Sequence, residues 1–176
     1  MSNWNKIFKP IVVLCAICII ITGALAATNG VTAPIIEAAT LAAQEAARTE
    51  LLPEATGFTK VEGINVENVA DVYASDNNVG TVITSSAKGY GGSMTVMVAF
   101  NTDGTIKQIK VTEQAETQGL GTKVTTDPSY WTRYIGLEAK TLTLGTDVDA
   151  MTGATISSRA LISAVNAAID GFNAIP

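Results

Sequence analysis

Residues 94–112 read MTVMVAFNTDGTIKQIKVT, and this stretch decides the fold because apolar residues alternate with other residues ahead of a turn. The alternating apolar side chains share one face of a strand: Met94, Val96, Val98 and Phe100. Asp103-Gly104 is a favoured turn pair, and residues 106–112 return as a second strand. Upstream, segments 71–74 and 80–85 flank the turn-prone Asp76-Asn77-Asn78. We therefore predict two hairpins in an antiparallel sheet.

The C-terminal segment predicts a helix that packs on this sheet. Its apolar residues recur at helical spacing along one face: Leu161, Ile162, Val165, Ala168, Ile169 and Phe172. Earlier in the chain, Asp127-Pro128 supplies an N-cap and first turn for a short aromatic helix over 129–134, and residues 141–144 have strand character. The sequence thus predicts an α+β fold, with an antiparallel sheet packed by helices.

A long uncharged segment lies near the N-terminus. Residues 10–27 read PIVVLCAICIIITGALAA, about the length that crosses a hydrocarbon core as a helix. A cleaved signal peptide is the alternative, since Lys6 and Lys9 precede the run and Ala24-Leu25-Ala26 is similar to a cleavage site. In either case the lysines are expected to stay in the cytoplasm and the soluble domain to lie outside it. We favour the retained helix, which makes the segment a single-pass anchor in the cell membrane.

The domain boundaries follow from this anchor. Thr32-Ala33-Pro34 is expected to end the first helix and begin a second, alanine-rich helix that ends at Leu52-Pro53. We predict a cytoplasmic tip and transmembrane anchor over 1–30, a helical stalk over 31–53, and one soluble domain over 54–176. A chain of 176 residues is too short for two full domains with separate cores.

The composition excludes several classes of function. A net charge of −5 without a Lys/Arg cluster argues against a nucleic-acid partner. The absence of histidine removes imidazole bases and histidine-ligated haem or zinc, and we predict no metal site. Cys15 and Cys18 have C-x-x-C spacing but lie within the apolar run, so we interpret them as lipid-facing residues.

Residues 149–158 read DAMTGATISS and lead into the C-terminal helix. Gly153 and Ala154 leave room beside the backbone, and four hydroxyls gather at the helix start: Thr152, Thr155, Ser157 and Ser158. Unpaired N–H groups and the positive end of the helix dipole make such a terminus a natural phosphate site. Ser and Thr are also favoured there as simple helix caps, so both interpretations stay open.

Asp149–Thr155 matches the D-x-x-(S/T)-G-A-T flavinylation signature at every specified position. This segment resembles the FMN-binding domains of the Rnf ferredoxin:NAD oxidoreductase and of the related sodium-translocating NADH:quinone oxidoreductase. The resemblance implies an FMN joined by a phosphoester to Thr155, with Asp149 as part of the motif. It also implies a flavin transferase that uses FAD and magnesium, and partner subunits in a membrane complex. The chain length fits the G subunit of Rnf.

Two further stretches resemble the same family. Residues 116–123, ETQGLGTK, are similar to its E-T-x-G-L-G loop, with Gln118 where many relatives have proline. Gly89-Tyr90-Gly91-Gly92 is similar to a G-Y-G-G element that we interpret as structural. The cofactor contacts implied by the resemblance are Thr152, Gly153, Ala154, Ser157 and Ser158 from the first motif, and Glu116, Thr117, Gly119, Leu120 and Gly121 from the second.

The sequence lacks a nicotinamide fingerprint and the cysteine groupings of an iron–sulfur cluster. FMN would therefore be its only redox centre, and we predict a non-catalytic electron-transfer subunit; ion coupling is implied by the resemblance alone. Two alternatives stay open: a membrane-tethered scaffold or binding module in which Thr155 only caps a helix, and a stand-alone extracytoplasmic flavin reductase.

Overall fold

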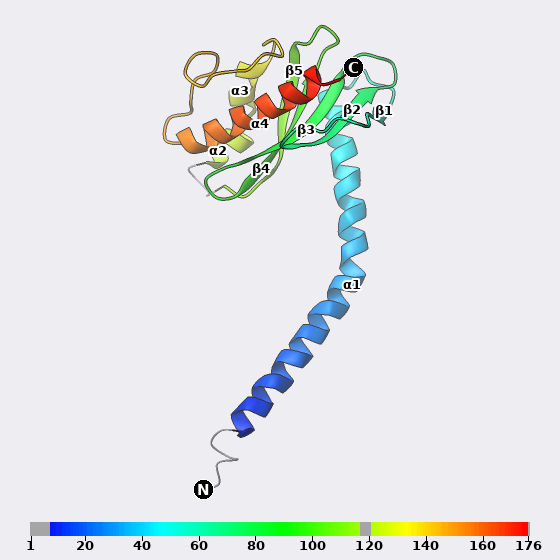
Figure 1. Ribbon diagram of the computed structural model, residues 1–176, viewed down its shortest axis with the longest axis vertical. Coiled ribbons are helices and arrows are strands. Elements are labelled where there is room, and N and C mark those ends of the chain that lie inside the picture. Colours follow the sequence, from blue (N-terminus) through cyan, green and yellow to red (C-terminus); the bar gives the residue numbers. More distant parts are fainter. Residues whose placement is uncertain (1–7, 117–120, 176) are drawn as a thin grey trace. The chain divides into compact units, whose positions relative to one another are not determined.

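A computed structural model describes residues 8–116 and 121–175 (Figure 1). The chain divides into two compact units between Ala43 and Gln44. Helix α1 (Lys9–Leu51) supplies the first unit and continues into the second, which holds all the strands and the remaining helices.

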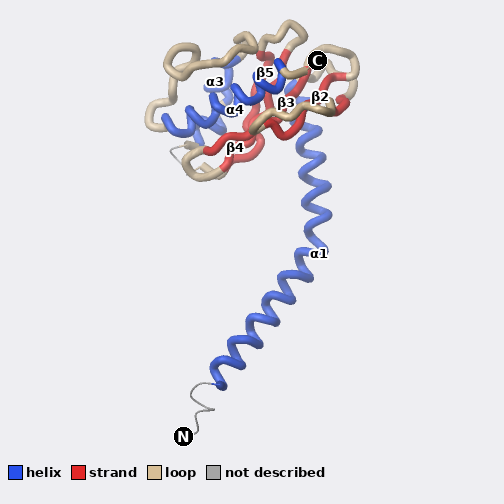
Figure 2. Tube along the Cα trace, viewed as in Figure 1, coloured by secondary structure: helices blue, strands red, loops and turns tan. Residues whose placement is uncertain are grey.

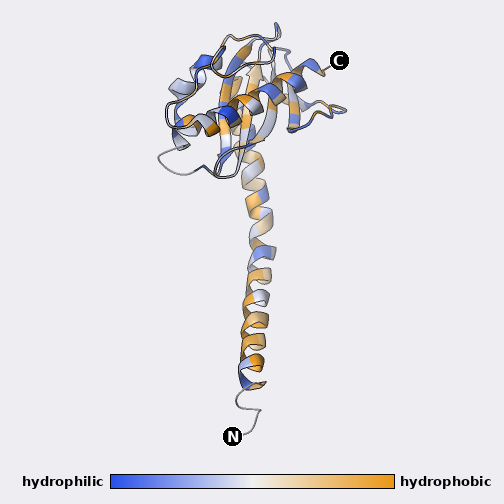
Figure 3. Cartoon of the chain, turned by 60° about the vertical axis from the view of Figure 1, so that its left-hand side comes forward, coloured by the Kyte–Doolittle hydropathy of each residue, from blue (hydrophilic) through white to orange (hydrophobic). Residues whose placement is uncertain are grey.

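Helix α1 is continuous over 43 residues and has Pro34 in its interior, so the predicted break at Thr32-Ala33-Pro34 is wrong. Proline removes one backbone N–H donor from the helix, and alanine-rich sequence on its C-terminal side favours continuation. Close to Pro34, the Thr32 hydroxyl donates to the carbonyl of Thr28 at 3.0 Å. By length and composition α1 can cross a membrane, and Figure 3 shows the apolar residues concentrated in its N-terminal half.

The second unit is built on an antiparallel sheet whose described strands follow the chain order: β1 (Phe58–Lys60), β2 (Val69–Ser75), β3 (Thr81–Lys88), β4 (Ser93–Phe100) and β5 (Ile106–Gln114) (Figure 2). Both predicted hairpins are confirmed, as β2–β3 and β4–β5. Strands β3 and β4 also pair, from Thr81 opposite Phe100 to Lys88 opposite Ser93, which joins the hairpins into one meander. The edge strand β1 was not predicted.

The turns of these hairpins have residues suited to them. Asn78 in the β2–β3 turn has φ 54°, and Gly104 in the β4–β5 turn has φ 81°. Asparagine and glycine are the residues that most readily adopt this left-handed conformation. The turn signals in the sequence therefore reflect real backbone requirements.

Within the described residues, four helical segments follow the sheet. Three are short, namely α2 (Thr122–Thr126), α3 (Pro128–Trp131) and the 3-10 helix η2 (Thr132–Tyr134), and the fourth is the long helix α4 (Thr155–Asn173). The predicted cap of the aromatic helix is confirmed, because the Asp127 carboxylate accepts the N–H of Ser129 at 2.9 Å. Hydrogen bonds from the hydroxyl and N–H of Ser129 lower the pKa of Asp127 below its ordinary value.

Helix α4 packs on one face of the sheet, mainly against β3 and β4 (Figure 1). The face predicted from its periodicity is confirmed, since Leu161, Val165 and Ile169 are buried in the main core. On the opposite face, a smaller apolar cluster joins the end of α1 to the sheet: Ala47, Leu51, Leu52, Val82, Met97 and Ala99. Two ion pairs, Lys110–Glu50 and Lys107–Glu54, also join strand β5 to the end of α1 and the residues just after it.

Residues 141–144 do not form the predicted strand; Leu144 makes an isolated parallel bridge with Val148. The reason lies in Asn166 of α4, whose side-chain amide takes both backbone groups of Leu142. Its Oδ1 accepts the Leu142 N–H at 2.8 Å, and its Nδ2 donates to the Leu142 carbonyl at 2.9 Å. Both backbone groups of Leu142 are thus paired by a side chain, and the Thr143 N–H donates to the Asp147 carboxylate at 2.8 Å, so these groups need no neighbouring strand.

Candidate functional site

A hollow of about 320 Å³ lies where helix α4 begins. Three segments far apart in the sequence supply its lining: Tyr90 from the β3–β4 turn, Glu116 and Gly121 after β5, and Gly153, Ala154, Thr155, Ile156 and Ser157 at the start of α4. The three glycine-containing motifs of the sequence therefore meet at one place.

Thr155 is the first residue of α4, and it is exposed in the wall of the hollow. Before it, Gly153 has φ 81°, a conformation that suits glycine, and Ala154 occupies the N-cap position. The structure describes no side-chain hydrogen bond that caps α4. Ala154, rather than Thr155, occupies the N-cap position, which gives no support to the alternative interpretation of Thr155 as a helix cap.

The first turn of α4 is suited to an anion. The first N–H groups of an α-helix lack partners within the helix, and the aligned peptide dipoles place partial positive charge there. In α4 the Ala154 carbonyl accepts the Ser158 N–H at 2.9 Å, so regular helical bonding begins at that pair. The backbone N–H groups of Thr155, Ile156 and Ser157 come before this first regular hydrogen bond, and all three residues line the hollow.

Glu116 lies at the centre of the contacts that hold the hollow together. Its side chain is turned inward and only 8% exposed. Oε1 accepts the backbone N–H of Tyr90 at 2.9 Å, and Oε2 accepts the hydroxyl of Ser157 at 2.9 Å. One carboxylate thus joins the β3–β4 turn, the segment after β5 and the first turn of α4.

The Glu116 carboxylate fits into its position because the residues that face it are glycines. A Cβ added to Gly89 or to Gly121 would collide with the Glu116 carboxylate, and one on Gly121 would also meet the Ser157 hydroxyl. Gly121 is therefore required for close approach rather than for an unusual φ angle. The Glu116 clamp, meaning Glu116 with Tyr90 N–H and Ser157 Oγ, has room only because these positions lack side chains.

The other residues predicted from the motifs do not line the hollow or lie outside the described residues. Ser158 is fully buried, and its Oγ accepts the Met151 N–H at 3.0 Å, so this hydroxyl is engaged inside the protein. The Asp149 carbonyl accepts the Tyr130 hydroxyl at 3.0 Å, and Thr152 is exposed outside the lining. Thr117, Gly119 and Leu120 lie outside the described residues. Flavin contact by Ser158, Thr152, Thr117, Gly119 and Leu120 stays a prediction, and so does the place of Asp149 in the flavinylation motif.

Two lining residues were absent from the predicted set. Tyr90 is 66% exposed and Ile156 is 53% exposed, although both are large apolar side chains. The Gly89-Tyr90-Gly91-Gly92 element is predicted from the sequence to be structural. An aromatic residue set among glycines at a hairpin turn was the available signal for a surface contact.

Comparison with known proteins agrees with this geometry. A model of the FMN-binding domain family matches residues 89–170. The chain is also 33% identical over 190 residues to the G subunit of the Na(+)-translocating ferredoxin:NAD(+) oxidoreductase complex of Acetobacterium woodii, across 95% of this chain and 92% of that protein. The chain belongs to the G-subunit family of ion-translocating oxidoreductase complexes. The resemblance inferred from the sequence motifs is thereby confirmed.

Other members of this family and a related structure extend the match. The G subunit of the ion-translocating oxidoreductase complex of Methanosarcina acetivorans is 31% identical over 182 residues, covering 97% of this chain and 96% of that protein. The crystal structure of NqrC from Shewanella oneidensis has a TM-score of 0.50 and 26% identity, and the similarity covers 69% of this chain and 67% of that one. Every residue that lines the hollow falls within the matched FMN-binding domain of this G-subunit family member.

Proposed function

We propose that this chain is an electron-transfer subunit of a membrane-bound, ion-translocating oxidoreductase complex of the Rnf type, and that it carries electrons on one FMN joined by a phosphoester to Thr155. The observation that carries the proposal is the position of Thr155. It is an exposed hydroxyl at the start of α4, in the wall of the hollow, at the last position of the flavinylation signature. Membership of the G-subunit family supports the assignment to a complex.

The residues present fit FMN. The start of α4 offers N–H groups and the positive end of a 19-residue helix to a phosphate. Gly153 and Ala154 leave the approach to Thr155 free of bulky side chains, and nothing lies within 4 Å of a Cβ placed on Gly153. Ile156 adds an exposed apolar surface beside them. Bound there, FMN would supply the redox chemistry, while the chain's own residues fix its position and surroundings.

Attachment requires chemistry that this chain only partly supplies. The Thr155 oxygen would attack the flavin-side phosphorus of FAD; a phosphoester bond forms, the bond to the AMP portion breaks, and AMP leaves. The hydroxyl proton must pass to a base, because a threonine hydroxyl alone is a weak nucleophile. Glu116 lines the hollow, but both of its oxygens already accept hydrogen bonds. We therefore assign the base and the magnesium ion to a separate flavin transferase.

We further propose that α1 anchors the chain in the bilayer, with the N-terminus in the cytoplasm and the Gln44–Pro176 unit outside it. Lys6 and Lys9 precede the apolar run, which is the arrangement that the positive-inside rule favours. A covalent bond suits this location, since a dissociated FMN would be lost from the cell. The partners of the chain would be the other subunits of the complex, the transferase and the lipid bilayer.

Intact-mass measurement of the denatured chain, produced together with a flavin transferase, tests the proposal. The wild-type protein is expected to gain the mass of one FMN less one water. Thr155→Ala is expected to gain nothing, whereas Thr155→Ser, which keeps a hydroxyl at the start of α4, should still be modified. A wild-type chain without added mass would reject the covalent flavoprotein and favour the tethered scaffold.

A further inference from the structure

We propose that Tyr90 is an aromatic contact that covers the flavin ring, and that Glu116 is the positioning residue that holds Tyr90 in place. The inference rests on the proposed function, because it requires FMN on Thr155. It adds a residue to the site that neither the flavinylation signature nor the E-T-x-G-L-G loop contains.

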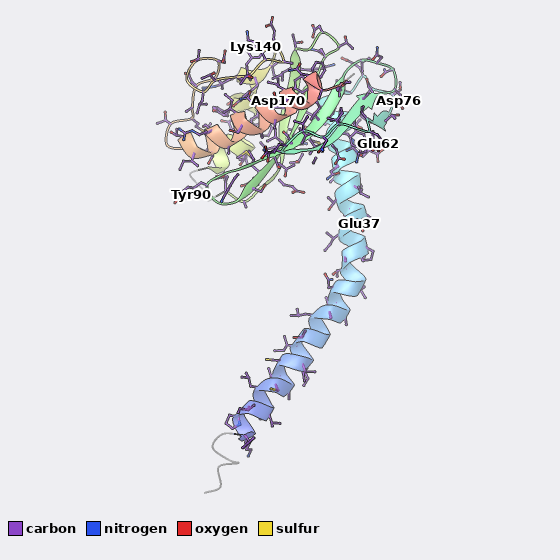
Figure 4. All side chains as sticks on the ribbon, in the orientation of Figure 1. Glu37, Glu62, Asp76, Tyr90, Lys140 and Asp170 are labelled. Atoms are coloured by element: carbon purple, nitrogen blue, oxygen red, sulfur yellow. The ribbon has the colours of Figure 1, made fainter. Side chains whose placement is uncertain are left out.

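The surroundings of Tyr90 indicate a ligand contact rather than a role in folding. Its side chain is 66% exposed, yet it lines the same hollow as Thr155. Figure 4 shows Tyr90 at the edge of the domain where α4 begins. An aromatic ring contributes little to the fold while it stays in water, whereas contact with another flat ring removes a large apolar area from solvent. Pockets for organic cofactors commonly combine such aromatic walls with a few polar groups.

The backbone of the β3–β4 turn is held tightly against the segment after β5. The Gly89 N–H donates to the Gly92 carbonyl at 2.7 Å, which closes the turn. A Cβ on Gly91 would collide with the Ala115 carbonyl, and one on Gly92 would stand 2.7 Å from the Ala115 Cβ. Among the four residues of the turn, Tyr90 alone carries a side chain. That side chain is therefore the contribution of the turn to the hollow.

Glu116 ties the position of Tyr90 to that of the attachment residue. The carboxylate accepts the Tyr90 N–H through one oxygen and the Ser157 hydroxyl through the other. Ser157 lies two residues after Thr155 in the first turn of α4. A single side chain thus sets the spacing between the aromatic residue and the hydroxyl that would hold the flavin.

Substitution by glutamine can distinguish the negative charge of Glu116 from its two hydrogen bonds. A glutamine has nearly the same shape, can accept the Tyr90 N–H through its oxygen, and can donate its amide hydrogen to Ser157 Oγ. Glu116→Gln is therefore expected to preserve the spacing, whereas Glu116→Ala removes both hydrogen bonds. The two variants form a matched pair for any measurement that reports on Tyr90.

Flavin fluorescence is the measurement that tests the inference, because a tyrosine or tryptophan ring in contact with a flavin quenches its emission by electron transfer. The full-length chain is produced in detergent with a flavin transferase, and emission is normalised to the flavin attached, as determined by intact mass. Wild type is expected to be strongly quenched. Tyr90→Leu should raise emission per flavin severalfold, while Tyr90→Trp should keep it low.

The Glu116 pair completes the test. Glu116→Gln is expected to stay quenched, and Glu116→Ala to become brighter, although flavin remains attached in both. Fully attached flavin with equal emission in wild type and Tyr90→Leu would overturn the aromatic contact while leaving the proposed function intact. Wild type without attached flavin would overturn both proposals. Equal quenching in Glu116→Ala and wild type would overturn the positioning role of Glu116.

Discussion

Replacing Glu116 by alanine should destabilise the chain even before any cofactor is attached. The substitution removes two hydrogen bonds to a carboxylate that is only 8% exposed, one from the Tyr90 N–H and one from the Ser157 hydroxyl. Hydrogen bonds to charged groups contribute about 1.5–3 kcal/mol each. Loss of the buried charge offsets part of this, since desolvating a carboxylate is itself unfavourable. We expect a net loss of about 2–4 kcal/mol, or about 10 °C in Tm for a domain of this size.

The assay is thermal denaturation of the full chain in detergent, followed by near-ultraviolet circular dichroism. Glu116→Gln preserves both hydrogen bonds and should cost less than about 1 kcal/mol. Glu113→Ala is the matched control, because it removes an exposed carboxylate near the end of β5 and should stay within about 0.5 kcal/mol of wild type. If Glu116→Ala melts together with Glu113→Ala, the clamp does not stabilise the fold. If Glu116→Gln is as damaging as Glu116→Ala, the negative charge matters rather than the hydrogen bonds.

Three further outcomes are expected. Burial raises the pKa of Tyr134 well above its ordinary value of 10.0, so the folded chain keeps a proton that the unfolded chain loses. Unfolding free energy should therefore fall by up to about 1.4 kcal/mol per pH unit above about pH 10, and Tyr134→Phe should show a shallower fall in denaturant titrations. Asn166→Ala leaves the two backbone groups of Leu142 without their partners and should cost about 1–3 kcal/mol by thermal denaturation. Gly121→Ala forces a methyl group against the Glu116 carboxylate and should cost about 1–3 kcal/mol in chemical denaturation, together with reduced flavin attachment by intact mass.

The elements with a clear period were predictable from the sequence. Alternation over Met94–Phe100 and helical spacing over Leu161–Phe172 each predict a set of residues that share one face, and the structure packs both sets in the main core. The opposite face of β4 is buried as well, in the smaller cluster at the end of α1. Strand propensity at residues 141–144 gives a wrong assignment: the amide of Asn166 pairs with the backbone of Leu142 from 24 residues away, and the Thr143 N–H donates to the Asp147 carboxylate. The break predicted at Pro34 also failed, since the surrounding helix tolerates one missing donor.

The sequence motifs indicated segments that meet in the candidate site, but not the direction of the side chains there. The flavinylation signature located Thr155, and the glycine-rich loop located Glu116 near the same hollow. Sequence spacing within a loop does not reveal whether a carboxylate faces a ligand or turns inward. Glu116 turns inward because Tyr90 N–H and Ser157 Oγ, both distant in sequence, supply hydrogen atoms there. Such tertiary contacts have no local signature.

The chain order of the fold has a consequence for the biogenesis of the site. Strands β1 to β5 are spatial neighbours in the order of synthesis, so each new strand pairs with one already made. Helix α4, which carries Thr155, comes after them all. A chain that ends at residue 150 would hold Tyr90 and Glu116 but would lack Thr155, the proposed acceptor of the cofactor. If Thr155 carries FMN as proposed, chains truncated before α4 would carry no covalent cofactor and would stay colourless.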